Sequence, residues 1–172
     1  MRLTYIDLKI LMKFRRLNTE ELQDLEQEFI QFLVANTVTG EDWVKLKEEE
    51  PEKAEGLIEV FSDIVFEKVV KNIQFLEFRT PEDIKTFQCL EDKIVMNGLR
   101  MEGEAEIDLT TDLPPAEMFQ KLQQADVKLQ IYTAEKGYVP DRGAELFRML
   151  EGGAKISREG QLFQAIEAFK AG

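Results

Sequence analysis

The chain has 172 residues, a length that fits one domain with one core, and 44% of its residues are hydrophobic. Its 34 acidic and 22 basic residues give a net charge of −12, which repels nucleic-acid phosphates and favours a basic protein surface as partner. The chain has no histidine and one cysteine, which excludes Ser-His-Asp and Cys-His catalysis and the usual zinc sites, so we expect a non-enzymatic protein without cofactor or metal.

We predict an N-terminal extension over residues 1–17 and a single domain over residues 18–172. The extension has a net charge of +4, against −16 for the rest of the chain. Such a segment contacts either another anionic surface or the acidic domain itself. Met12 is an alternative translation start, and residues 1–11 would not be native if it were used.

Helices are expected over the first third of the domain. Asn18 and Glu21 form a capping-box pattern, which begins a helix that ends near Ala35. A short helix follows over residues 41–49, and a third one over residues 51–71. Because this third helix is apolar on more than one stripe, we expect it to be covered on at least two sides as the spine of the core.

The apolar period then shortens towards two, which favours strands. Asn97-Gly98 is either a bulge or a tight turn, because both residues tolerate positive φ. Strands are expected over residues 73–79, 85–90, 93–101, 105–109 and 127–132, the last with its even-numbered side chains towards water.

Helices return after residue 114, over residues 116–124, from the cap at Asp141 to Gly152-Gly153, and after Gly160. This order predicts an α+β fold. We expect the N-terminal helices to pack on a mostly antiparallel four- to five-stranded sheet, with the C-terminal helices added to it.

The segment Glu135–Arg142, EKGYVPDR, is the densest group of polar residues between a strand and a helix, and we call it the connection. Loops at such places often carry binding sites. The alternative is structural: Gly137 and Pro140 set a turn and Asp141 caps the next helix. The candidate partner-binding residues are Lys136, Tyr138, Asp141 and Arg142.

Acidic residues on the third helix raise the question of a metal site. Glu59, Asp63 and Glu67 lie four apart on one face, but no EF-hand or di-iron spacing is present, so we expect a solvated face. An inward Asp63 would pair with Arg79, Lys85 or Lys93. Two other polar or aromatic features, Cys89 and Trp43, are expected to be buried core residues rather than a nucleophile and a partner anchor.

No secretion signal and no run of about 18 apolar residues is apparent, and a lone cysteine suits a reducing compartment, so we expect a cytoplasmic protein that does not bind a membrane. Four stretches, KFRRLNTEELQDLEQEFIQFL, EDWVKLKEEEPEKAE, FSDIVFEKV and TAEKGYVPDRGAELFRMLEGGAKIS, resemble a family of short, acidic, uncharacterised proteins from Bacteroidota with a domain of unknown function. The resemblance covers Lys13 to about Phe169 and implies a bacterial cytoplasmic setting without a particular activity.

Three hypotheses for function follow. The first is a non-enzymatic interaction or adaptor protein that binds a basic protein surface, and the second is an inhibitor that mimics nucleic acid or acts as an immunity protein. The third and weakest is a carboxylate-dependent metal enzyme. The oligomeric state stays open.

Overall fold

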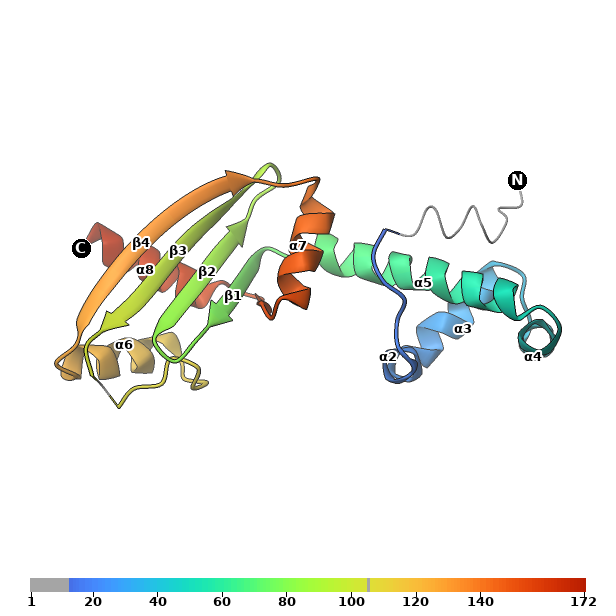
Figure 1. Ribbon diagram of the computed structural model, residues 1–172, viewed down its shortest axis with the longest axis horizontal. Coiled ribbons are helices and arrows are strands. Elements are labelled where there is room, and N and C mark those ends of the chain that lie inside the picture. The colour runs from blue at the N-terminus through green and yellow to red at the C-terminus, as the bar shows by residue number, and fades with distance from the viewer. Residues whose placement is uncertain (1–12, 105) are drawn as a thin grey trace. The chain divides into compact units, whose positions relative to one another are not determined.

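The computed structural model describes residues 13–104 and 106–172, which form two compact units. The first unit ends at Lys71 and the second runs from Asn72 to Gly172, and each is described by itself. N-terminal helices, a five-stranded antiparallel sheet and interleaved later helices confirm the predicted α+β class (Figure 1). Two predictions stay untested: that residues 18–172 form a single domain, and that the N-terminal helices pack on the sheet.

The first unit is helical, and its first helix differs from the prediction. The capping box is confirmed, because the Glu21 N–H donates to Asn18 Oδ1 (2.8 Å) and the Asn18 N–H donates to Glu21 Oε2 (2.8 Å). One helix to Ala35 is wrong, since Leu25 leaves helical geometry (φ −105°, ψ 23°) and divides the segment in two. The helices are α2 (Thr19–Asp24), α3 (Glu26–Ala35), α4 (Gly40–Glu49) and α5 (Pro51–Lys71).

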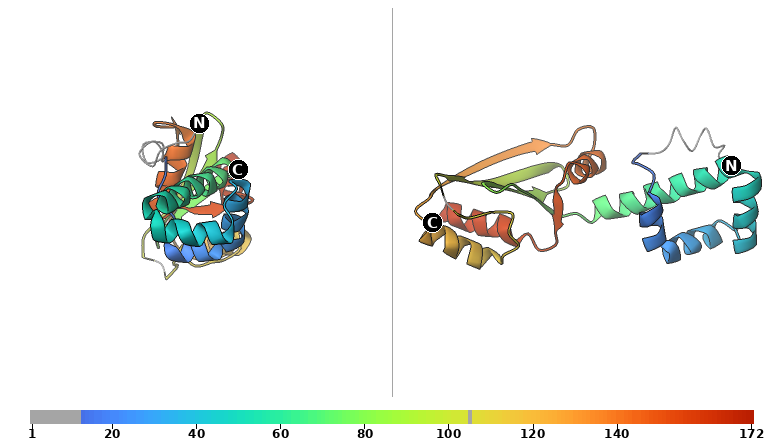
Figure 2. Two further views of the ribbon diagram at one scale, coloured as in Figure 1. Left: turned by 90° about the vertical axis from the view of Figure 1, so that its right-hand side faces the viewer. Right: turned by 60° about the horizontal axis from the view of Figure 1, so that its bottom comes forward.

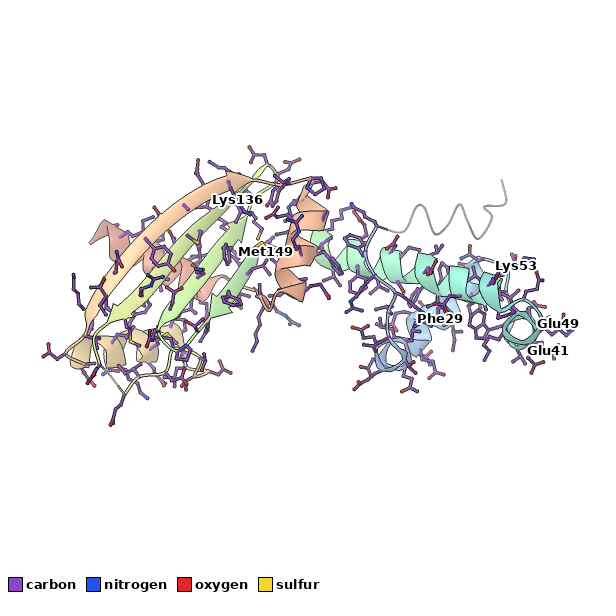
Figure 3. The ribbon with its side chains drawn as sticks, viewed as in Figure 1. Phe29, Glu41, Glu49, Lys53, Lys136 and Met149 are labelled. Carbon is purple, nitrogen blue, oxygen red and sulfur yellow. The ribbon has the colours of Figure 1, made fainter. Side chains whose placement is uncertain are left out.

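A cluster of aromatic rings holds these helices together. After the break at Leu25, Phe29 and Phe32 both contact Phe61 of α5, with ring centroids 5.1 and 5.4 Å apart (Figure 3). The Trp43 ring meets the Phe29 ring edge to face at 5.2 Å, so Trp43 packs in this cluster as expected. We predicted that α5 is covered on at least two sides. This prediction is wrong in part, because the apolar side chain of Ile64 is 51% exposed.

The second unit is built on the sheet, whose strands lie in the order β4-β3-β2-β1-β5 with every pair antiparallel. α6 (Pro115–Gln124) and α8 (Gln161–Ala171) cover one face and bury a core with β2 and β3 (Figure 2). α7 (Arg142–Glu151) follows β4 and buries Leu146 fully. The strands are β1 (Phe75–Arg79), β2 (Asp83–Cys89), β3 (Lys93–Glu102), β4 (Lys128–Gly137) and β5 (Lys155–Ser157).

Three strand predictions need correction. Residues 106–109 form a loop instead of a strand, because the buried Leu109 donates its N–H to the Pro81 carbonyl (3.0 Å); Ala105 lies outside the described residues. β4 pairs with β3 as far as Gly137, five residues beyond the predicted end, and the short β5 was missed. Leu129 and Ile131 of β4 pack against the core as the alternation predicted.

Asn97-Gly98 is neither a bulge nor a turn, since both residues lie in the middle of β3 and pair with β2 and β4 in regular register. Gly98 serves a close approach: a Cβ there would lie 2.1 Å from Cζ of Tyr132. The Tyr132 ring thus rests on the backbone of β3, and its hydroxyl donates to Asp83 Oδ1 (2.6 Å) on β2.

Candidate functional site

Arg142, at the end of the connection, binds backbone carbonyls. Its Nη2 donates to the carbonyls of Ile73 (2.5 Å) and Cys89 (3.2 Å), and its Nε donates to the Leu90 carbonyl (3.2 Å). These carbonyls belong to the segment before β1 and to the end of β2, far from Arg142 in sequence. The Arg142 side chain therefore connects α7 to the sheet. The carbonyls that it binds are backbone acceptors, which need a hydrogen-bond donor whenever this unit is folded.

The other candidate residues of the connection are also bonded within the unit. Tyr138 donates its hydroxyl to the Leu90 carbonyl (2.6 Å), and the Asp141 carboxylate caps α7 at the Ala144 N–H (2.9 Å). The Lys136 ammonium, labelled in Figure 3, pairs with the buried carboxylate of Glu145. Val139 also donates its N–H to that carboxylate (3.2 Å).

The geometry of the connection therefore favours the structural alternative. Lys136 bonds the Glu145 carboxylate, whereas Tyr138 and Arg142 both bond the Leu90 carbonyl, so all three side chains are bonded to groups of their own unit. The hydrogen bond from Lys136 is the main cause that lowers the pKa of Glu145, a buried residue that the sequence analysis did not single out. Partner binding by the connection stays a prediction.

In the first unit, residues 13–17 lie along α5, and we call them the strap (Figure 1). The N–H groups of Lys13 and Phe14 donate to the two carboxylate oxygens of Asp63 (2.6 and 2.9 Å). Leu17 is 2% exposed, and its N–H donates to Ser62 Oγ (2.9 Å). The part of the basic extension that the structure describes thus folds back on the acidic chain.

The strap also pairs its cations with acidic side chains. Arg16 pairs with Glu55, and the Lys13 ammonium lies 3.4 Å from a Glu67 carboxylate oxygen. Arg15 makes two 2.8 Å hydrogen bonds to Glu21, which lower the pKa of Glu21 to about 2. An inward Asp63 was expected to pair with Arg79, Lys85 or Lys93. Asp63 is instead half-buried and accepts from the strap, while Arg79 pairs with Glu77 (2.9 Å).

We call Glu55, Glu59, Asp63 and Glu67 the acidic face of α5, since residues four apart lie on one side of a helix. We predicted that this face is exposed to solvent. The prediction is wrong for Glu59, which is only 7% exposed. Its Oε2 atom is buried and has no hydrogen-bond partner among residues 13–104 and 106–172. The strap holds Glu55 on one side of it and Asp63 on the other, so Glu59 lies between the strap's anchor points.

A second surface of the first unit combines acidic and apolar side chains. Residues 19–50 contain ten acidic residues and two lysines, a net charge of −8, and Glu41 and Glu49 project from α4 (Figure 3). In this setting Ile30, Val34 and Val44 are 45%, 66% and 50% exposed. The sequence analysis missed them, although Ile30 and Val34 stand on the α3 side away from Phe29 and Phe32, which a helical wheel separates.

Other chemistry finds little support in the described residues. Cys89 is 6% exposed, and burial raises the pKa of its thiol to about 11, so it is a core residue as expected. A cleft of about 500 Å³ is lined by Glu77, Arg79, Asp112 and Glu159 among others, and its Arg79 already bonds Glu77 and the Thr111 carbonyl. Within residues 13–104 and 106–172, no three His, Cys, Asp or Glu side chains are grouped as metal ligands.

The helices of this same described part are too short or too polar to cross a membrane. No curated protein and no solved structure matches the chain. The model of one family, described as "Family of unknown function (DUF6495)", matches residues 12–171, nearly the same extent as the resemblance noted in the sequence. The chain therefore belongs to this family of unknown function.

Proposed function

We propose that this protein is a non-enzymatic interaction module whose first unit binds a basic, partly apolar segment of another protein. One observation carries the proposal: Ile30, Val34 and Val44 are exposed within residues 19–50, a segment with a net charge of −8. Exposed apolar side chains within a field of one sign are typical of a binding surface, because they supply affinity and the field attracts and orients the partner. A basic amphipathic helix or strand has the complementary chemistry.

The test uses calorimetry with the full chain and a synthetic amphipathic peptide of leucine and lysine. We expect Val34→Lys to weaken binding by about thirtyfold, because it removes apolar contact and adds a like charge, each of which costs about 1 kcal/mol. Ile156→Lys is the matched control, since Ile156 is 48% exposed but lies in the second unit, outside the connection. Equal binding by both variants would contradict the proposed surface.

The same pair of variants separates this proposal from nucleic-acid mimicry. A mimic binds through ordered carboxylates alone, so its affinity for a basic protein would fall by a similar factor in both variants. Capture of a partner from the native host at low and high salt then extends the test, with Val34→Lys as the bait that should lose the partner.

A further inference from the structure

We propose that the acidic face of α5 is a second peptide-binding site, which the strap occupies in the free protein and which a basic partner segment enters by displacing the strap. The inference rests on the proposed function only in taking the partner to be basic. It adds a separate site, its ligand and its regulation by the chain's own residues 13–17.

The strap itself shows which chemistry this face recognises. Asp63 accepts two consecutive backbone N–H groups at a bend of the chain, a contact that uses main-chain donors and no particular side chain. Ser62 accepts a third N–H, beside the buried side chain of Leu17. The face thus binds main-chain N–H groups, one apolar side chain and cationic side chains. A short basic peptide with apolar residues offers all three kinds of group.

Glu59 is the second, independent observation, and it points to a missing ligand group. Its Oε2 is buried without a partner, although a buried carboxylate oxygen in a folded protein is normally hydrogen-bonded. It lies between Glu55 and Asp63, which the strap already holds. A partner segment that places a Lys or Arg side chain here would satisfy the one acceptor that the strap leaves unsatisfied.

The strap is suited to exchange. Its ion pairs are half exposed: the side chains of Arg16 and Glu55 are 37% and 34% exposed, and those of Lys13 and Glu67 are 41% and 55% exposed. Ion pairs of this kind are weak and are screened by salt. A tethered strap nevertheless has a high effective concentration, so it competes with free peptides and reduces their apparent affinity.

The test measures fluorescence anisotropy of a labelled peptide, Lys-Phe-Arg-Arg-Leu flanked by two lysines at each end, with the full chain. Arg16→Gln weakens the strap, and we expect it to bind the peptide about fivefold more tightly than the unchanged chain, because the competent state becomes more populated. Glu59→Gln should bind it about fivefold more weakly, because glutamine keeps an acceptor oxygen but loses the negative charge that pairs with the incoming cation. Glu52→Gln, an exposed change on the same helix, should leave the affinity within about twofold.

Hydrogen exchange supplies a readout that does not depend on affinity. Saturating peptide should speed exchange of the Phe14 and Leu17 amides, which donate to Asp63 and Ser62 in the free protein. Unchanged exchange, or equal peptide affinity for Arg16→Gln and Glu59→Gln, would overturn the inference. A concentration-dependent dimer of Arg16→Gln without peptide would also overturn it, since the occupant would then be the strap of a second copy.

The outcomes are distinguishable from those for the proposed function. If Val34→Lys weakens binding of the leucine-lysine peptide but neither Arg16→Gln nor Glu59→Gln affects the labelled peptide, the exposed surface stands and the strap exchange fails. If the strap variants behave as expected and Val34→Lys has no effect, the acidic face of α5 stands alone.

Discussion

Arg16 in the strap and Arg142 in the connection have the same side chain, but they bond different acceptors. Arg142 donates to three backbone carbonyls that are far from it in sequence, whereas Arg16 pairs with the partly exposed carboxylate of Glu55 and donates to the carbonyl of its neighbour Leu17 (2.6 Å). A carbonyl at a strand end needs a donor in every folded molecule, while a surface carboxylate can exchange its protein partner for water or another cation. The connection therefore holds the fold, and the strap can be replaced.

The largest expected effect is in the connection. Arg142→Met keeps the aliphatic part of the side chain but leaves the Ile73, Cys89 and Leu90 carbonyls without this donor, so we expect a loss of about 3 kcal/mol in the free energy of unfolding by urea. The buried Cys89 should then react faster with a thiol reagent. Arg158→Met, an exposed change in the same unit, should cost less than about 0.5 kcal/mol. A loss for Arg142→Met no larger than that of Arg158→Met would contradict the structural role.

Much of the fold could be predicted from local sequence patterns. The Asn18 and Glu21 side chains, the alternation around Leu129 and Ile131, and the glycines after α7 act over a few residues, so a pattern describes them well. The break at Leu25 and the loop at Leu109 could not be predicted this way. Ring packing against Phe61 and a hydrogen bond to the distant Pro81 carbonyl decide them.

The sites show the same limit. The sequence marked the connection because its polar residues are consecutive, but the partners of Lys136, Tyr138 and Arg142 are 9 to 69 residues away. It marked Glu59, Asp63 and Glu67 by their spacing on one helix face, but it could not show that the strap bonds Asp63 and Glu67. Whether a charged group is bonded or unsatisfied depends on contacts between segments distant in sequence, which spacing does not report.

A smaller effect is expected at Glu145, the residue of α7 that pairs with Lys136 of the connection. Glu145→Gln keeps an oxygen for the Val139 N–H but removes the charge that pairs with Lys136, so we expect a loss of about 1–2 kcal/mol at neutral pH. Because the folded-state pKa of Glu145 is lowered, its contribution is complete above the pKa of the unfolded chain and is lost as the pH falls through the folded value. Urea unfolding at several pH values should therefore show wild type and variant converging in acid, and a constant difference would contradict this assignment.

The strap should respond to salt where the connection does not. Arg16→Ala removes a half-exposed ion pair, so we expect it to cost about 1 kcal/mol at low salt and less than half of that at about 1 M sodium chloride. The cost of Arg142→Met should change little over the same range, because its acceptors are neutral carbonyls. Unfolding midpoints for both variants at the two salt concentrations measure the contrast. If both costs fell in parallel, the two arginines would not differ in the way proposed.

The smallest expected effect concerns the ion pair that joins the strap to α2. The two hydrogen bonds from Arg15 are the main cause that lowers the pKa of Glu21 to about 2, with the Asn18 N–H as a further cause. A lowered folded-state pKa means that this stabilisation is present above about 4.5, the ordinary value, and is lost as the pH falls towards about 2. Since the Glu21 side chain is 33% exposed, solvent screening reduces the effect to below about 1 kcal/mol.

Glu21→Gln is the informative change, because glutamine retains the capping box and loses only the charge. Its difference from wild type should disappear between pH 4.5 and 2, and Glu20→Gln, a change at an exposed neighbour, is the control variant. A difference that persists at pH 2 would mean that Glu21 stabilises the chain through the cap rather than through the strap.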